Sequence, residues 1–388
     1  MKARILVGDV FDRLADIEDG TVQTCVTSPP YWGLRDYGTA EWEGGDDGCD
    51  HLVGPLASDS STLGGGAGPG KNDKVRAFSV PFKGDCGKCG ARRIDHQLGL
   101  EPTPEEYVER MVAVFREVRR VLRDDGTLWL NLGDSYASDI KGSGGMGEKS
   151  PLHRDGRLGQ SQHFQPRRLR HGLKPKDLVG IPWRVAFALQ ADGWWLRSDI
   201  IWAKPNPMPE SITDRPTKAH EYLFLLTKSA RYYYDHEAIK ERGQPTAEFD
   251  AGVDRNWDGR KDGTVPGKGD PHASGTRAGV NLSRAYAGVD WSKEGRNRRT
   301  VWTISTQPFK EAHFAVMPEA LVEPCVKAGT KPGSLVLDPF AGSGTVGVVA
   351  LRHGCDFVGV ELNPEYAAMA ERRVGGTMPL FAQTKVEA

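Results

Sequence analysis

A glycine-rich turn near the carboxyl end of the chain has the composition of a ligand-binding loop. It lies between a predicted strand and a predicted helix and reads Leu337-Asp338-Pro339-Phe340-Ala341-Gly342-Ser343-Gly344-Thr345. Glycines let a ligand approach the backbone, and a helix amino terminus offers free N–H groups. Glu361 follows the next predicted strand, where a carboxylate can accept hydrogen bonds from both hydroxyls of a ribose. The spacing favours a nucleoside-containing cofactor, with a plain strand–helix turn as the alternative.

The second motif, Ser28-Pro29-Pro30-Tyr31, follows a predicted strand over 21–26. Two consecutive prolines cannot continue a central strand, so the chain must leave the sheet there. These residue types suit the methylation of an exocyclic amino group on a base. The Ser28 hydroxyl and the Pro29 carbonyl can accept its two protons and localise the nitrogen lone pair. Tyr31 can stack on a base swung out of the duplex. A proline-rich loop without chemistry is the alternative interpretation.

Together, the two motifs resemble those of the amino-group DNA methyltransferases that use S-adenosylmethionine. Their order, catalytic motif first and cofactor motif last, is similar to the β-class permutation. The resemblance extends to four further segments, which are Gly8-Asp9, Trp202-Ala203-Lys204-Pro205-Asn206, His220-Glu221, and His313-Phe314 leading into Met317-Pro318. It implies an α/β fold of the Rossmann-like methyltransferase type, with a mostly parallel sheet, a circularly permuted motif order and inserted loops.

The resemblance also implies a role for each motif residue. The catalytic residues would be Ser28, Pro29, Pro30 and Tyr31. The cofactor-binding residues would be Asp9, Asp338, Phe340, Gly342, Ser343, Gly344, Thr345 and Glu361. Glu361 would bind the ribose, and Asp9 would lie near the adenine edge. The methyl group would pass in line from the sulfonium to the nitrogen, without a covalent enzyme intermediate.

The first residue of the catalytic motif bears on the choice of base. Ser28 resembles the cytosine-N4 enzymes, whereas adenine-N6 enzymes usually carry Asp or Asn there. We therefore expect methylation of cytosine N4 at a specific duplex sequence, with adenine N6, an RNA base or a protein amide as alternatives. Cytosine-C5 enzymes need a Pro-Cys nucleophile on a loop. Pro324-Cys325 lies in a predicted helix between Val322 and Val326, which favours a core cysteine.

Cysteines and a histidine form a second constellation. Cys86-Gly87-Lys88-Cys89-Gly90 resembles a zinc knuckle, and Cys49 with His51 can complete a tetrahedral Cys₃His site. His96 is a rival fourth ligand, and two unrelated polar loops are the alternative. Such a zinc ion would be structural because no coordination position stays open. A zinc-dependent DNA-binding protein with an inactive cofactor pocket is the corresponding alternative outside enzymes.

The elements that position these motifs alternate as strand and helix at both ends of the chain, which predicts one α/β sheet built from both termini. Thr103, with Pro104 at the first helical position and Glu106, predicts a capped helix that ends at Asp125-Gly126. The expected organisation is a methyltransferase core over 1–42, 98–240 and 301–375, a zinc-binding insertion over 43–97 with a disordered middle, a target-recognition region over 241–300 and a tail over 376–388.

Composition limits the partners. The 51 Lys and Arg residues against 52 Asp and Glu residues give a net charge of −1, which excludes a uniformly cationic nucleic-acid coat. Residues 141–176 nevertheless carry nine Lys and Arg against Glu148 and Asp155, a local charge of +7, which suits DNA phosphates or a solvated loop. Six cysteines, no predicted signal peptide and no predicted membrane span favour the reducing cytoplasm of a bacterial or phage-infected cell. A separate restriction endonuclease is an expected partner.

Overall fold

The computed structural model describes residues 1–33, 39–46, 48–49, 51, 85–86, 88–137, 172–241, 295–307 and 316–377, and the backbone of 383–387. Residues 1–235 and 300–388 form one compact unit, and residues 236–299 form a second. Several sequence-based expectations lie outside the described residues. They are the middle of the 43–97 insertion, residues 141–171 of the basic loop, residues 242–294 and His313-Phe314.

A nine-stranded sheet organises the first unit, in the order β11-β1-β10-β9-β2-β5-β7-β6-β8. The strands are β1 (Lys2–Val7), β2 (Val22–Thr27), β5 (Leu122–Leu132), β6 (Trp195–Ala203), β7 (His220–Thr227), β8 (Val301–Thr303), β9 (Leu335–Asp338), β10 (Asp356–Glu361) and β11 (Gln383–Glu387). Every neighbouring pair is parallel except the two pairs that contain β7. The sheet is therefore mostly parallel, as the sequence predicts.

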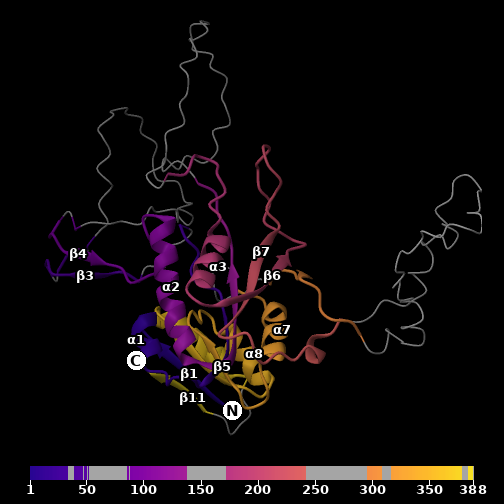
Figure 1. The fold of residues 1–388 in the computed structure, drawn as a ribbon. Helices are drawn as coiled ribbons and strands as arrows, with labels where there is room; N and C mark the ends of the chain where they lie inside the picture. Colours follow the sequence, from indigo (N-terminus) through magenta and orange to yellow (C-terminus); the bar gives the residue numbers. More distant parts are fainter. Residues whose placement is uncertain are drawn as a thin grey trace, which may run out of the picture. The chain divides into compact units, whose positions relative to one another are not determined.

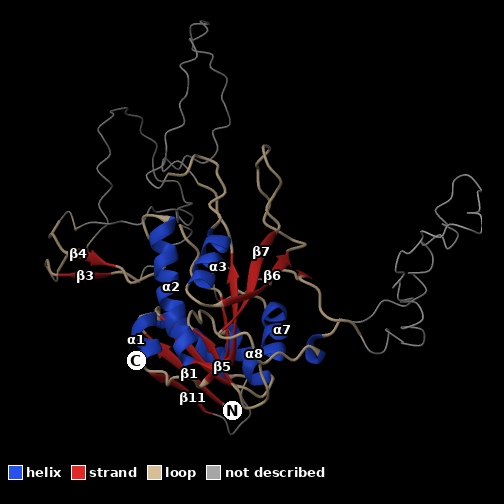
Figure 2. Ribbon diagram, in the orientation of Figure 1, coloured by secondary structure: helices blue, strands red, loops and turns tan. Residues whose placement is uncertain are grey.

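Strands from both ends of the chain interleave in this sheet. β1 pairs with β10, and β2 pairs with β9, so the amino-terminal and carboxyl-terminal segments share one core. β11 extends the sheet beyond β1, so the segment interpreted from the sequence as a tail contains an edge strand. Figures 1 and 2 show the strands at the centre of this unit, with helices on either side.

The helices form two layers. In one layer, α1 (Val10–Ala15) and α3 (Ile181–Ala191) each contact α2 (Pro104–Val121). In the other, α7 (Glu319–Gly329) and α9 (Pro364–Gly375) each contact α8 (Thr345–Arg352). Among the described residues, no helix is both long and apolar enough to cross a membrane. Pro324 and Cys325 lie inside α7, and Cys325 is fully buried, which confirms a core cysteine.

Helix α2 shows how the sequence specifies an element and where it fails to. The Thr103 hydroxyl accepts a hydrogen bond from the Glu106 N–H at 3.1 Å, which confirms the predicted cap. The buried face then recurs at helical spacing, for example at Tyr107, Met111 and Val114. The expected end at Asp125-Gly126 is wrong. The helix ends at Val121 and β5 begins at once, with a register shift against β2 that accommodates the extra residues.

Two smaller structures complete the described chain. β3 (Glu41–Glu43) and β4 (Arg92–Ile94) form an antiparallel two-stranded sheet, and in the sequence both strands lie between the catalytic motif and α2. The second unit contains a short 3₁₀ helix, η1 (Glu237–Ile239), and an antiparallel bridge between Glu241 and Arg296. Within that unit the Glu241 carboxylate accepts hydrogen bonds from the side chains of Arg296 and Arg299, at 3.2 and 3.0 Å.

Candidate active site

The two sequence motifs meet at the carboxyl ends of β2 and β9. The chain leaves β9 through α8 to β10 on one side, and leaves β2 through α2 to β5 on the other. Such a switch point is where open α/β sheets bind ligands. The Thr27 hydroxyl donates a hydrogen bond to Asp338 Oδ1 at 2.6 Å, and both side chains are buried. Residues 311 positions apart in the sequence are therefore in direct contact.

The glycine-rich turn uses its two glycines differently. The Phe340 N–H donates to Asp338 Oδ1 at 3.1 Å, which closes the turn. Gly342 has a φ of +51°, and among the described residues a Cβ there would have only the Phe340 carbonyl oxygen, at 4.0 Å, within reach. Gly344 has a φ of +77°, and a Cβ there would lie 3.0 Å from the Ala370 side chain of α9. Gly342 therefore borders open space, whereas Gly344 permits close packing of two helices.

Two acidic residues lie beside this turn. The Glu361 carboxylate accepts hydrogen bonds from the N–H groups of Gly342 and Asn363, at 2.8 and 2.9 Å. Asp9 follows β1, the strand next to β10, and caps α1 by accepting from the Phe11 N–H at 2.8 Å. The strand pairing thus places Asp9, Glu361 and the glycine-rich turn along one edge of the sheet.

Burial raises the pKa of two carboxyl groups at this edge of the sheet. It raises the pKa of Asp338 to about 7, although the hydrogen bonds from Thr27 and Phe340 oppose that rise. Burial also raises the pKa of Glu361 above its ordinary value, although hydrogen bonds from three backbone N–H groups act to lower it. A carboxyl with such a pKa gains charge readily when a cation binds beside it.

Ser343 and Thr345 have a different environment from the other predicted cofactor residues. The Arg373 guanidinium of α9 donates to the hydroxyls of Ser343 and Thr345, at 2.7 and 3.2 Å, and to the Ser343 carbonyl oxygen. Both residues are buried. Their hydroxyls hold the turn against α9, and a direct contact with a cofactor stays a prediction for them.

Tyr31 links the catalytic motif to two further strands, β5 and β7. The Tyr31 hydroxyl donates to Glu221 Oε2 at 2.7 Å and lies 3.1 Å from Asn131 Oδ1. The Ser28 hydroxyl donates to the Tyr31 oxygen at 3.3 Å. Lys204 forms an ion pair with the other Glu221 oxygen. Burial, followed by the nearby Glu221 charge, raises the pKa of Tyr31 well above its ordinary value, so the phenol stays protonated and able to donate.

The backbone around Tyr31 is tightly packed. A Cβ on Gly133 would lie 2.5 Å from the Tyr31 ring, and a Cβ on Gly99 would lie 2.9 Å from the Tyr31 carbonyl oxygen. The Tyr107 hydroxyl donates to the Pro30 carbonyl oxygen at 2.9 Å. These contacts fix the motif from two sides, so its side chains are held before any substrate arrives.

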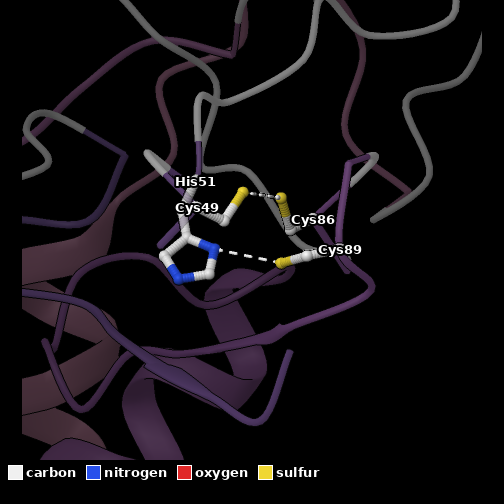
Figure 3. A group of neighbouring side chains, drawn as sticks. All are labelled: Cys49, His51, Cys86 and Cys89. Carbon is white, nitrogen blue, oxygen red and sulfur yellow. Dashed lines mark hydrogen bonds between the residues drawn. The ribbon is translucent and has the colours of Figure 1, made fainter. Parts of the chain in front are cut away.

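A third group lies outside the sheet, on the loops beside β3 and β4. The ligand atoms of Cys49, His51, Cys86 and Cys89 all lie within 4.8 Å of one another. Figure 3 shows these four side chains pointing toward one another. The Cys89 and Lys88 N–H groups and the His51 ring lower the pKa of Cys86 to about 6, with Cys89 contributing most. His96, the rival fourth ligand, lies outside this group and has its Nδ1 atom 3.8 Å from Asp9 Oδ2.

Comparison with known proteins identifies the family. The sequence profile of the N6/N4 DNA methylases matches residues 22–372, which include all motifs of the sheet edge except Asp9. This chain belongs to that DNA methylase family.

Relatives and a solved structure agree with this assignment. The type II methyltransferase M.Cfr9I of Citrobacter freundii is 40% identical over 374 residues, which are 96% of this chain and 88% of the relative. The type II methyltransferase M.SmaI of Serratia marcescens is 38% identical over 371 residues, 96% of this chain and 90% of the relative. The structure of the PvuII DNA methyltransferase (cytosine-N4-specific) shares the fold, with a TM-score of 0.52 at 16% identity over 96% of this chain and 86% of that one.

The residues at the carboxyl ends of β9 and β10 fit S-adenosylmethionine, the methyl donor that the family implies. Gly342 borders open space where a side chain would obstruct a ligand, and the buried Asp338 carboxyl can balance a positive charge. The Glu361 carboxylate has about four acceptor positions, so it can accept a ribose hydroxyl in addition to its backbone N–H groups. The residues present therefore match the polar groups of the donor.

Sequence reasoning missed part of this site. Thr27 and Asn131 contact predicted site residues but lie outside the motifs, and only the resemblance points to Glu221. Asn131 had a signal, because it is a polar residue within the otherwise apolar run Leu128-Trp129-Leu130-Asn131-Leu132. The link from Tyr31 to Glu221 spans 190 residues, and no local pattern could have shown it.

Proposed function

We propose that this enzyme is a site-specific methyltransferase that acts on the exocyclic N4 amino group of cytosine in duplex DNA. The observation that supports it most is the hydrogen bond between Thr27 and Asp338, because it brings the catalytic motif to the glycine-rich turn. This contact supports a single site for the two motifs, at the neighbouring ends of β2 and β9, rather than two separate ones. S-adenosylmethionine supplies an electrophilic methyl group when it is bound there.

In this proposal, the residues of the catalytic motif orient the amino group. The Ser28 hydroxyl and the Pro29 carbonyl oxygen accept its two hydrogens, which localises the nitrogen lone pair toward the methyl donor. A base inside a duplex cannot reach these atoms, so the cytosine must be flipped out. Tyr31 is held by Asn131 and Glu221, and a ring fixed in this way is a preformed stacking surface for the flipped base.

The choice of cytosine rests on Ser28, which stands where adenine-N6 enzymes usually carry Asp or Asn. A neutral hydroxyl can accept one amino hydrogen while it donates to Tyr31. Adenine N6 is the alternative substrate within the same fold. Ser28 would serve either reaction, so only the methylated product distinguishes them.

The wider proposal concerns partners and accessory regions. Because M.Cfr9I and M.SmaI are named type II methyltransferases, we place this enzyme in a restriction-modification system with a separate endonuclease. Residues 241–300 are proposed to recognise the target, together with the basic loop 141–176. We also propose a structural zinc ion at Cys49, His51, Cys86 and Cys89, independently of the reaction. Its substrate, cellular DNA, would place the reaction in the bacterial cytoplasm.

Transfer of a labelled methyl group from S-adenosylmethionine tests this function. Unmethylated duplex DNA, RNA and a protein mixture are offered together as acceptors. Label should enter the DNA alone, and the Ser28→Ala variant should incorporate it more slowly, on the order of 10²-fold or more, while it still binds S-adenosylmethionine. Label in RNA or protein would overturn the DNA assignment. Failure of the wild-type enzyme to bind S-adenosylmethionine by calorimetry would instead favour a DNA-binding protein with an inactive pocket.

A further inference from the structure

The four side chains beside β3 and β4 have the spacing of a tetrahedral metal site. A zinc ion with Zn–S bonds of about 2.3 Å and a Zn–N bond of about 2.0 Å separates two sulfurs by about 3.8 Å and sulfur from nitrogen by about 3.5 Å. The Cys49 and Cys86 sulfurs are 3.8 Å apart, and the Cys89 sulfur is 3.3 Å from His51 Nδ1. Three sulfurs and one imidazole nitrogen match the ligand set of structural zinc.

The local backbone is shaped to bring these atoms together. The Gly90 N–H donates to the Cys86 carbonyl oxygen at 2.8 Å, and the φ of +72° at Gly90 lets the chain turn back between the two cysteines and β4. A Cβ on Gly45 would lie 2.7 Å from the Cys89 sulfur, so only glycine allows this approach. These contacts join the two halves of the insertion at one point.

His51 has an uncommon backbone conformation. Its φ is +40°, which is uncommon outside glycine, and its ring stacks on Trp42 at a centroid distance of 5.0 Å. Strain of this kind persists only where other interactions compensate for it. A metal bond to Nδ1 provides such an interaction.

The described part of the insertion has a small apolar core. β3 and β4 contribute three residues each, and an isolated two-stranded sheet is at best marginally stable. Among the described residues of 39–51 and 85–94, only Cys86 and Ala91 are buried. A bound ion can replace the missing hydrophobic core.

The segment that leads out of β4, residues 95–101, returns directly to the catalytic motif. The Gly33 N–H donates to the Gly99 carbonyl oxygen at 2.8 Å, and the Trp32 indole N–H donates to the Glu101 carbonyl oxygen at 2.9 Å. His96 in the same segment lies beside Asp9. The chain therefore leaves the catalytic motif, passes through the four-residue group and comes back against the same motif.

We propose that Cys49, His51, Cys86 and Cys89 bind one structural zinc ion, and that this ion holds residues 95–101 against the catalytic motif. Four protein ligands close the coordination sphere, so the ion takes no direct part in methyl transfer. The positioning role rests on the proposed function, whereas the binding of zinc does not.

Metal content tests the site. Protein purified without added metal should contain about one zinc ion per chain, and the Cys89→Ser and His51→Ala variants should lose it. The matched control is His96→Ala, which removes a nearby histidine outside the group and should keep the ion. Cobalt reconstitution should give the visible absorption of tetrahedral thiolate coordination. Zinc-free wild-type protein that takes up no cobalt under reducing conditions, or loss of zinc in His96→Ala, would overturn the assignment.

Hydrogen–deuterium exchange tests the positioning role without reference to activity. Removal of zinc with a chelator should speed amide exchange in peptides that cover 28–33 and 95–101, because the Gly33 N–H loses its stable partner. Peptides from β9 and β10 should be unaffected. DNA methylation by the same sample should fall at least about tenfold and recover with Zn²⁺ but not Mg²⁺. Unchanged exchange would show that the ion does not position the motif. A zinc-loaded enzyme that methylates nothing would contradict the proposed function and leave the metal site intact.

Discussion

Ser28 and Asp338 lie on neighbouring strand ends but serve different parts of the proposed reaction. Ser28→Ala removes an acceptor for the amino group and leaves the glycine-rich turn intact. We predict that kcat falls on the order of 10²-fold or more, because positioned proton acceptors contribute about that much. The dissociation constant for S-adenosylmethionine, measured by calorimetry, should stay unchanged. A Ser28→Ala enzyme with near-normal kcat would remove this residue from the catalytic site.

Tyr31 and Glu221 should act as one unit because a single hydrogen bond joins them. Tyr31→Phe keeps the ring but loses the hydroxyl, and Glu221→Gln keeps the shape but loses the charge. Each should lower kcat roughly tenfold through a mispositioned Ser28, and the double variant should be no worse than Tyr31→Phe alone. A double-mutant cycle on kcat measures this coupling. Strictly additive losses would show that the two side chains act independently.

The raised pKa of Asp338 predicts a pH dependence of cofactor binding. Below about pH 7 the free enzyme carries a protonated Asp338, and above it the carboxylate is charged. A cationic sulfonium favours the charged form, so affinity should rise with pH by at most about tenfold per unit until pH passes 7. Calorimetric titrations from about pH 5.5 to about pH 8.5, on either side of the Asp338 pKa, measure how the dissociation constant changes with pH. Asp338→Asn should bind weakly at every pH, and a wild-type slope in that variant would contradict the assignment.

At the scale of elements, the glycine-rich turn offers a comparison of two neighbouring positions. The backbone is left-handed at both Gly342 and Gly344, and an alanine that adopts this conformation costs about 1–3 kcal/mol. Gly344→Ala adds a close contact with α9 and should lower the free energy of unfolding further. Gly342→Ala projects into open space and should instead weaken S-adenosylmethionine binding at least about tenfold. Thermal unfolding and calorimetry measure the two effects, and identical behaviour of both variants would contradict this division.

The elements that were predicted from the sequence are those with local signals. Thr103 is a side-chain cap followed by proline, and α2 begins where these residues indicate. Asn363 before Pro364 is the same local pattern, and it caps α9. The order of β9, α8 and β10 follows from alternating apolar runs and the glycines between them. β11 and the junction of α2 with β5 were not predicted, because they depend on pairing with distant strands rather than on neighbouring residues.

The site was predicted to a similar extent. Each motif is visible alone, and the alternation of strands and helices at both ends of the chain predicts one sheet that carries both. The Cys89–His51 contact was also expected from residue types, and the distances now support it. The environment of Tyr31 was not predictable, because Gly99, Gly133 and Glu221 reach it only through the folded sheet.

At the scale of the whole molecule, a chain with a net charge of −1 must bind DNA through a local basic surface. The loop 141–176 is the strongest candidate in the sequence, although most of it lies outside the described residues. Replacement of Arg167 and Arg168 by alanine should weaken DNA binding and reduce the slope of log K against log salt by about 0.9 for each lost phosphate contact. Binding measured over a range of salt concentrations gives this slope. An unchanged slope would exclude these two residues from phosphate contact.

The central claim is that this enzyme methylates cytosine N4. Unmethylated duplex DNA that contains many sequences is incubated with the purified protein and S-adenosylmethionine, digested to nucleosides and analysed by mass spectrometry. The prediction is N4-methylcytosine as the modified nucleoside, formed far more slowly in a parallel reaction with Ser28→Ala. N6-methyladenine in its place would contradict the claim, and would show that Ser28 does not determine which base is methylated.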